Sequence, residues 1–267
     1  MPNLPVKGVS DELLKTIQSI FQEDLFKDFR LGGGTSLALK HNHRISVDID
    51  LFTDKVFDYN QLNNIVDLLK NKFKDDIHIQ TLNFGNTEFP KSPVAFIKAE
   101  IPSLNTKLDI MQGIPLLKDI EICKGIPMVH DDDIGSMKLL AAADRGTRKD
   151  FIDLILLTNE KPLEHYFDVL KVRATTFKGI KNLFDDTGNK PSSLIKNITP
   201  LADFNKAADE SSHNNKLIFT QNSSVNHSWF NIQQIWGKRV QVLASKKAIP
   251  FSKTVQNRGY KRKGFSM

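Results

Sequence analysis

The chain has 267 residues and a single cysteine, Cys123. One cysteine cannot form an internal disulfide or supply a cysteine-rich zinc site, so both kinds of site are excluded. This usage is typical of a reducing compartment, and we expect a cytoplasmic protein. No apolar run approaches the ~18 residues of a membrane span. The first fifteen residues also lack the apolar core of a secretory signal, so we expect neither a membrane partner nor export.

Two widespread catalytic motifs are missing as well. The sequence has no Gly-x-x-x-x-Gly-Lys-Ser/Thr loop, which argues against a P-loop NTPase. It has no Gly-x-Ser-x-Gly motif, which argues against the nucleophile elbow of many hydrolases. Cys123 has no recognisable catalytic surroundings, and we interpret it as a small residue near a turn.

Acidic residues are absent after Glu210. Ten of the 37 Lys and Arg residues follow that position, which leaves 27 basic against 31 acidic residues before it. The net charge of +6 is therefore a body of −4 that carries a C-terminal segment of +10. Such a segment is typical either of a contact with nucleic-acid phosphates or of a solvated tail.

Hydrophobic periodicity predicts an α+β fold with a mixed sheet flanked by helices. Apolar residues at helical spacing predict helices over 10–29 and 58–74, and alternation or β-rich composition predicts strands over 46–52, 77–84, 94–101 and 105–111. A helical region begins near Asp131 and continues to about residue 178. We expect three parts: a mixed α+β part at 1–125, a helical part at 126–184, and a basic, partly irregular segment at 185–267.

A run of three glycines, Gly32 to Gly34, is followed by Thr35, Ser36 and a short apolar stretch of helical character. Glycines at a helix start let main-chain N–H groups approach a phosphate, and the helix dipole favours the negative charge. A tight connection without a ligand is the alternative interpretation.

Carboxylates on strands form the second informative pattern. Asp48 and Asp50 alternate with apolar residues, so both project from one face of a strand about 7 Å apart. Two like charges on one face are unfavourable unless a cation or a basic group lies between them. If the strand that carries Asp109 is a neighbour, three carboxylates converge in a set that suits Mg²⁺. Glu100 is the alternative third ligand, and a solvated strand face is the alternative to a metal site.

These segments together resemble a known family. The stretch LGGGTSLALKHNHRISVDIDLF, the later LDI and the stretch DIGSMKLLAAADRGTRKDFIDLILL are similar in order and spacing to the motifs of the AbiEii/AbiGii toxin family of nucleotidyltransferases, within the DNA polymerase β-type superfamily. The resemblance covers roughly residues 5–180. It implies a polymerase β-like nucleotidyltransferase core at 1–125, a helical part at 126–184 that completes the active site, and a helical C-terminal region.

The resemblance also implies roles for individual residues. A nucleoside triphosphate would be held by Gly33, Gly34, Thr35 and Ser36, with the register open by one residue because this chain has three glycines. Mg²⁺ or Mn²⁺ would be bound by Asp48, Asp50 and Asp109. Lys138 would contact the phosphates and act in catalysis, and Asp150 and Asp153 would be a catalytic pair.

The residues alone give a weaker interpretation of the later positions. Asp150 and Asp153 share one helix face, and Arg145, Arg148 and Lys149 beside them would keep the carboxylates ionised. A surface ion-pair network is the alternative. Arg44 is expected to pair with Asp48 or with substrate, and His41 and His43 to be structural or solvated. Aromatic residues among the C-terminal basic residues could stack on bases, or Trp229 and Trp236, at i and i+7, could anchor one helix.

The implied function is a metal-dependent transfer of a nucleotidyl group from an NTP to a hydroxyl acceptor. The family implies a growth-inhibiting toxin of a toxin–antitoxin or abortive-infection system, with tRNA or another RNA as acceptor and a cognate antitoxin protein as partner. Two alternatives remain: a nucleotidyltransferase that modifies a small molecule such as an antibiotic, and a non-catalytic nucleotide- or RNA-binding protein.

Overall fold

The computed structural model of the chain describes residues 5–83, 95–177, 191–207 and 216–251. The chain divides into two compact units. The first comprises Met1–Ile134, Thr175–Thr187 and Ile218–Asn226, and the second comprises Gly135–Ala174, Gly188–Leu217 and His227–Met267. Five of the ten basic C-terminal residues lie beyond residue 251 and so outside the described residues.

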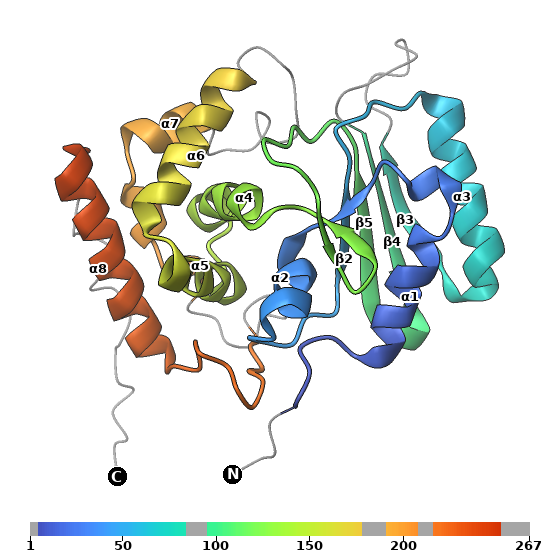
Figure 1. The fold of residues 1–267 in the computed structure, drawn as a ribbon, viewed down its shortest axis with the longest axis horizontal. Helices are drawn as coiled ribbons and strands as arrows, with labels where there is room; N and C mark the ends of the chain where they lie inside the picture. The colour runs from blue at the N-terminus through green and yellow to red at the C-terminus, as the bar shows by residue number, and fades with distance from the viewer. Residues whose placement is uncertain (1–4, 84–94, 178–190, 208–215, 252–267) are drawn as a thin grey trace, which may run out of the picture. The chain divides into compact units, whose positions relative to one another are not determined.

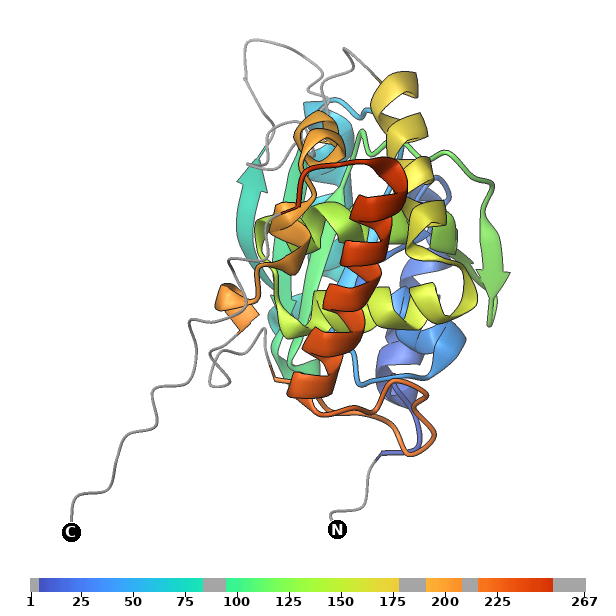
Figure 2. The same ribbon diagram turned by 90° about the vertical axis from the view of Figure 1, so that its left-hand side faces the viewer.

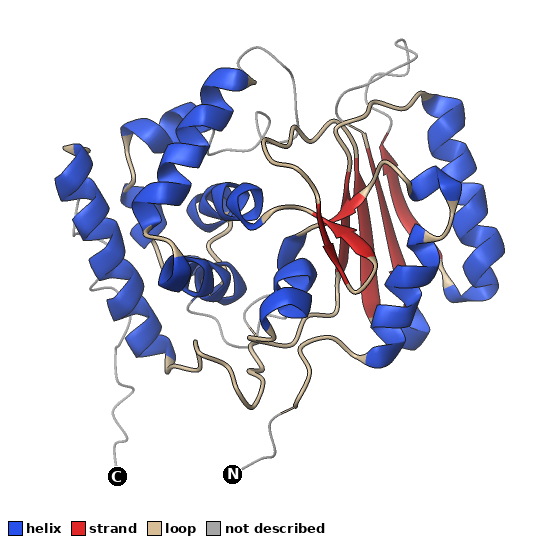
Figure 3. Ribbon diagram, viewed as in Figure 1, coloured by secondary structure: helices blue, strands red, loops and turns tan. Residues whose placement is uncertain are grey.

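The first unit is built on a mixed sheet of seven strands in the order β3-β4-β5-β2-β1-β7-β6 (Figure 3). Its central strands β2 and β5 are parallel, and β2 is antiparallel to β1. The strands are β1 (Arg30–Leu31), β2 (Ile49–Phe52), β3 (His78–Asn83), β4 (Phe96–Ile101), β5 (Thr106–Met111), β6 (Glu121–Cys123) and β7 (Ile126–Met128).

Helices α1 (Asp11–Phe21) and α3 (Tyr59–Phe73) cover one side of this sheet, and α2 (Gly33–His41) lies on the other side (Figure 1). The core is formed by the apolar faces of α1 and α3 with strand residues such as Ile49, Leu51 and Leu108, all of which are fully buried. Alternation along β2 and β5 therefore leaves their carboxylates on the opposite face.

Local sequence signals start the two covering helices. The side chain of Ser10 accepts a hydrogen bond from the main-chain N–H of Leu13, which caps α1 as expected. Asp58 and Gln61 form a reciprocal capping box at the start of α3. A short 3-10 helix at Asp24–Phe26 follows α1, and another at Pro102–Leu104 joins β4 to β5.

A segment from late in the chain returns to the first unit. The main-chain N–H of Ile45 donates to the carbonyl of Ile218 at 2.8 Å, and Arg44 forms an antiparallel β-bridge with Phe219. Thr220 is fully buried and its hydroxyl donates to the carbonyl of Asn42. We call residues Ile218–Gln221 the return segment; it fastens the loop between α2 and β2.

The second unit is helical. Its elements are the rest of α4 (Asp131–Asp144), α5 (Arg148–Glu160), α6 (Leu163–Thr176), α7 (Pro191–Lys196), two short 3-10 helices at Thr199–Ala202 and Asn205–Ala207, and α8 (Trp229–Lys247). Helix α8 packs on α5 (Figure 2). Phe151 is at the centre of the core, with ring centroids 4.9 Å from Phe204, 5.9 Å from Trp229 and 6.3 Å from Trp236.

The structure decides between the two interpretations of the tryptophans. Both lie on α8, and Trp236 is fully buried and donates its indole N–H to the carbonyl of Leu201 at 2.7 Å. Trp236 therefore anchors the helix and cannot stack on a base. The predicted mixed sheet flanked by helices, followed by a helical C-terminal part, is confirmed. Among the described residues, no helix is both long and apolar enough to cross a membrane.

Candidate active site

Two of the predicted carboxylates lie side by side on the sheet. Strand β2 pairs with β5 in parallel, and the register places Asp50 directly opposite Asp109. Both side chains are half-buried, whereas their neighbours Ile49, Leu51, Leu108 and Ile110 point into the core. The like charges of Asp50 and Asp109 therefore share one face at adjacent positions, which is unfavourable without a cation or basic group.

Asp48 lies two residues before Asp50 but outside the strand, because β2 begins at Ile49. Its Oδ1 is buried and has no hydrogen-bond partner among the described residues. A buried unpaired carboxylate oxygen is costly, so such an atom indicates a missing ligand or ion. Carboxylate oxygens are the ligands that a hard divalent cation prefers. Within the described ranges, however, no three His, Cys, Asp or Glu side chains are gathered closely enough to hold a metal ion.

Glu100, the alternative third ligand, is placed differently. It lies on β4 opposite Lys107, whereas Asp109 is opposite Lys98. Glu100 is thus on the strand beyond β5 and has no register partner on β2, while Asp109 has Asp50. The pairing of the strands favours Asp109.

The glycine run forms the start of α2. Gly32 is the N-cap and Gly33 the first helical residue, so the N–H groups of Gly33, Gly34 and Thr35 have no partner within the helix. Gly33 has a φ of +64°, and a Cβ there would lie 1.8 Å from Oδ2 of Asp50. The first turn of α2 therefore lies directly against β2, and only glycine fits between them. We call β2 together with the preceding Asp48 the acidic strand.

Replacing Gly33 by alanine is expected to destabilise the protein by about 1–3 kcal/mol, the usual cost of strained main chain, because the new methyl group meets the Asp50 carboxylate. Gly125→Ala is the matched control. Gly125 also has a positive φ, +77°, but a Cβ there has nothing within 4 Å. Urea unfolding of both variants measures the difference, and equal losses would show that the contact with Asp50 contributes nothing.

The hydroxyls of Thr35 and Ser36, which follow the glycines, differ in their hydrogen bonds. The Thr35 hydroxyl donates to the carbonyl of Asp48 and lies 2.9 Å from the Ser46 hydroxyl. It thus ties the start of α2 to the acidic strand. The hydroxyl of Ser36 is fully buried and has no hydrogen-bond partner among the residues described.

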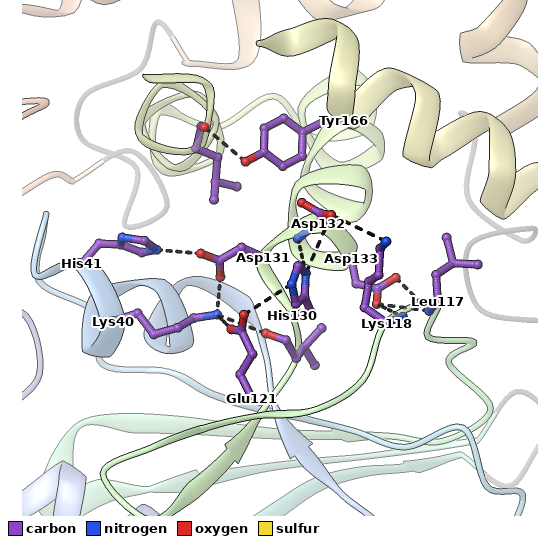
Figure 4. A network of polar contacts seen from close by, with 12 residues as sticks. Lys40, His41, Leu117, Lys118, Glu121, His130, Asp131, Asp132, Asp133 and Tyr166 are labelled. Atoms are coloured by element: carbon purple, nitrogen blue, oxygen red, sulfur yellow. Dashed lines mark hydrogen bonds and ion pairs between the residues drawn. The ribbon is translucent and has the colours of Figure 1, made fainter. Parts of the chain in front are cut away.

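An ionic network fixes the other end of α2 (Figure 4). Lys40 contacts Glu121 at 2.7 Å and also pairs with Asp131, the first residue of α4. His41 Nε2 lies 2.7 Å from the other oxygen of Asp131. Basic groups at a helix C-terminus also interact favourably with the helix dipole. The network therefore fixes the direction of α2 and, with it, the position of the glycine turn.

The network predicts a loss of stability in acid. Burial by itself raises the pKa of Asp131, but the hydrogen bonds and charges of His41 and Lys40 outweigh it, so the pKa lies below its ordinary value of 3.8. A lowered folded-state pKa stabilises the protein above pH 3.8, and this stabilisation disappears as the pH falls through the folded value. We expect Asp131→Asn to flatten this acid limb in urea unfolding at pH 2–6. Asp54→Asn, at an exposed carboxylate, is the control, and an unchanged limb in Asp131→Asn would contradict the assignment.

The second unit holds the three later predicted residues in one buried cluster. Lys138 Nζ lies 2.7 Å from Asp153 and 3.2 Å from Asp150, and both carboxylates are fully buried. Arg145 donates twice to Asp150, at 2.8 and 2.9 Å, and the Thr147 hydroxyl donates at 2.7 Å. The surface ion-pair network considered as an alternative is therefore wrong, because Lys138 and both carboxylates are buried.

The charges of the cluster hold Asp150 ionised. Burial raises the pKa of this carboxyl. The charges of Lys138 and Arg145 and the hydrogen bonds of Arg145 and Thr147 lower the pKa by more than burial raises it, so it lies well below its usual range. Lys138 is 7% exposed and is oriented by the two carboxylates. Arg148, which follows Thr147, donates to the carbonyl of Ala207 and stacks over the ring of Trp229.

The sequence predicted that Arg44 pairs with Asp48 or with substrate, and it assigned no role to Ser46. The structure puts both beside Gly34: a Cβ on Gly34 would lie 2.1 Å from Nη2 of Arg44 and 3.3 Å from the Ser46 hydroxyl. Both residues belong to the stretch that resembles the family motif, between the glycine turn and the acidic strand. The two histidines are structural, since His41 pairs with Asp131 and His43 is 1% exposed.

Comparisons with known proteins identify the family of this chain. The nucleotidyl transferase AbiEii toxin family of type IV toxin–antitoxin systems matches residues 16–223. An uncharacterized protein of Aquifex aeolicus (strain VF5) is 26% identical over 191 residues, which are 67% of this chain and 79% of that one. The fold is similar to that of MenT4, a nucleotidyltransferase toxin of Mycobacterium tuberculosis H37Rv, with a TM-score of 0.51, 16% identity and coverage of 88% and 85% of the two chains. JHP933 from Helicobacter pylori is 16% identical, with a TM-score of 0.47 and coverage of 89% and 91%.

Proposed function

Because the chain belongs to the AbiEii family of nucleotidyltransferase toxins, we propose that it uses a divalent metal ion to move a nucleotidyl group from an NTP to a hydroxyl of an RNA. The observation that supports this most is the register pair of Asp50 and Asp109, with the unpartnered Asp48 oxygen, beside the start of α2. The proposed cation site and the proposed phosphate site would thereby be adjacent within one unit.

The residues of the first unit have distinct proposed tasks. Asp48, Asp50 and Asp109 would hold Mg²⁺ or Mn²⁺, which when bound polarises the phosphates and lowers the pKa of an attacking hydroxyl. The N–H groups of Gly33, Gly34 and Thr35 would bind the triphosphate, and Ser36 would offer its buried hydroxyl. The acceptor oxygen forms a bond to the α-phosphorus, and the bond between the α-phosphorus and the oxygen that bridges it to the β-phosphorus breaks. Pyrophosphate leaves with that oxygen, and the hydroxyl proton passes to a carboxylate of this face.

The second unit contains the buried cluster of Lys138, Asp150 and Asp153. The family resemblance assigns Lys138 to the phosphates and a catalytic role to Asp150 and Asp153. Their contacts with Lys138 support a positioning role for the two aspartates, because both carboxylates hold its single ammonium group in place. A compact, oriented positive charge suits a phosphate whose charge grows as pyrophosphate leaves.

The C-terminal charge supports RNA, including tRNA, as the acceptor. Part of this charge is used inside the second unit: Lys246 and Lys247 pair with Glu164, Lys247 also with Asp168, and Arg239 donates to the carbonyl of Ile155. The charge available for phosphates therefore comes mainly from the remaining basic residues. As a type IV toxin, the protein would be countered by an antitoxin, and the reducing cytoplasm is the proposed compartment.

Two other functions remain candidates, and one experiment separates all three. The chain is incubated with each labelled NTP in turn, Mg²⁺ or Mn²⁺, total RNA and a small-molecule extract. Labelled RNA supports the proposal, and label in small molecules alone supports an antibiotic-type transferase. No labelled product, with retained nucleotide binding, indicates a non-catalytic binding protein.

A further inference from the structure

Arg44 is a charged residue in a buried position. It is 2% exposed, although it lies in the loop between α2 and β2. One guanidinium nitrogen, Nη1, donates to the carbonyl of Ile45 at 2.9 Å, and the other, Nη2, lies against Gly34 in the first turn of α2. A guanidinium in this position can contact an anion that binds at the glycine turn.

The two glycines at the start of α2 have neighbours of opposite charge. Gly33 is contacted by the carboxylate of Asp50, and Gly34 by the guanidinium of Arg44. A metal-bound triphosphate has the same arrangement, with a cation on one side and anionic oxygens on the other. The acidic strand suits the cation, and the arginine with the free N–H groups of the helix suits the phosphate oxygens.

Further polar groups surround the arginine. Ser46 has its hydroxyl 3.3 Å from the position that a Gly34 Cβ would occupy, and it contacts Thr35. Ser36, in the same turn, has a fully buried hydroxyl with no hydrogen-bond partner among the described residues. This second observation also indicates an absent ligand at the start of α2.

The loop that carries Arg44 is held from two sides. On one side the return segment binds it through the Ile45–Ile218 hydrogen bond, the Arg44–Phe219 bridge and the Thr220 hydroxyl. On the other side the N-terminal residues bind it: Ser46 N–H donates to the carbonyl of Gly8 at 2.8 Å, and Gly8 N–H donates to the side chain of Asn42 at 2.6 Å. A loop fixed in this way holds its guanidinium ready before the ligand arrives.

From these contacts we infer that Arg44 binds the triphosphate of the NTP at the start of α2, and that Thr220 of the return segment is a positioning residue for it. The inference rests on the proposed function and deepens it by adding a side-chain phosphate ligand. Arginine suits this task because its planar fork can bind two phosphate oxygens at once, which a lysine cannot.

The test uses the full-length protein and two probes, inorganic tripolyphosphate and Mg²⁺ with NTP. Affinities are measured by calorimetry, and KM and kcat for the NTP are measured in the labelling reaction. We expect Arg44→Gln to weaken binding of both probes about 10- to 100-fold, the range for losing hydrogen bonds to a charged group. Arg44→Lys is expected to weaken it about tenfold, because the charge stays but the fork is lost.

Thr220→Val tests the positioning role. It keeps the shape of the buried side chain and removes the hydroxyl bonded to Asn42, so the loop loosens while Arg44 stays. We expect KM for the NTP to rise about fivefold with a smaller change in kcat, the loss of roughly one neutral hydrogen bond. Arg239→Lys is the control: this half-buried arginine of the second unit also donates to main-chain carbonyl groups, and its replacement should leave both affinities unchanged.

The outcomes separate this inference from the proposed function. If folded Arg44→Lys and Thr220→Val bind tripolyphosphate and NTP as tightly as the original protein, Arg44 is purely structural and the inference is wrong. That result would leave nucleotidyl transfer itself intact. If binding depends on Arg44 but no acceptor is ever labelled, the proposed transfer is wrong and the phosphate site stands. Should Arg44→Gln fail to fold, the other two variants still decide.

Discussion

Asp48→Asn is expected to reduce nucleotidyl transfer by about 100- to 1,000-fold, the usual effect of removing one group that stabilises the transition state. The asparagine keeps the size of the side chain but lacks the charge that would hold a divalent cation. Asp48→Ala combined with Asp50→Ala should remove transfer altogether. The measurement is kcat/KM for labelled NTP with total RNA, together with calorimetric Mn²⁺ binding, which should weaken in parallel.

The same substitution is expected to leave stability unchanged or to raise it. Oδ1 of Asp48 is buried without a hydrogen-bond partner among the described residues, so the charge costs free energy in the folded state. A loss of activity without a loss of stability identifies a group kept for its chemistry. Asp54→Asn, at an exposed carboxylate, is the control for both readouts. Full NTP turnover by the Asp48→Ala, Asp50→Ala protein would refute the metal site.

The second large effect is expected in the buried cluster of the second unit. Asp153→Ala should lower the free energy of unfolding by about 3–5 kcal/mol, because it breaks a buried ion pair and leaves Lys138 with one carboxylate fewer. A double-mutant cycle with Lys138→Met and Asp153→Leu isolates the pair. The double variant should be more stable than the sum of the two single losses predicts, because each single variant keeps one charge of this pair buried without the other and the double variant removes both.

The contrast with an exposed pair provides the control for the cycle. Lys7 and Asp11 form an i,i+4 ion pair at 2.6 Å, but their side chains are 59% and 65% exposed. Lys7→Ala should hardly shift the urea midpoint, because solvent screens such pairs. The cluster is not a tightly coupled unit if Asp153→Ala also leaves the urea midpoint almost unchanged. The same conclusion follows if the losses in free energy of unfolding from Lys138→Met and Asp153→Leu simply add in the double variant.

Elements with strong local signals could be predicted from the sequence. The capped helices α1 and α3 begin at Ser10 and Asp58 because each side chain binds the main chain of its own first turn. The acidic strand was recognised because alternation sends carboxylates and core residues to opposite faces. The hypothesis of a three-carboxylate site assumed that this strand pairs with the strand of Asp109, since the sequence does not specify which strands become neighbours. The structure supplies that pairing, with Asp50 opposite Asp109.

Short elements without periodicity were missed. Strands β1, β6 and β7 have two or three residues each, too few for an alternating pattern, and they form because neighbouring strands pair with them. The buried state of Lys138, Asp150 and Asp153 was missed for a similar reason: a charged residue is expected outside until its partners are known. The return segment lies in a stretch of poor periodicity, and nothing local indicates that it binds a loop 173 positions earlier.

The roles assigned to the site residues and the boundaries at 125 and 184 stay predictions, because they concern ligand binding and independent folding. The predicted family and its nucleotidyltransferase activity are confirmed by the family match over residues 16–223. The chemistry of the site was recognisable from spacing, whereas the supports behind it, Arg44 and the network around Asp131, depend on residues distant in the sequence.

The return segment also affects the order in which the protein is completed on the ribosome. Domains usually fold from the N-terminus during synthesis, and contacts between distant positions form late. The seven strands of the sheet are all synthesised by residue 128, but the loop that carries Arg44 gains its second support only when residues 218–221 have been made. A nascent chain therefore carries the sheet and the acidic strand well before its nucleotide loop is fully held. For a toxin, this order delays the finished site until residues 218–221 have been made.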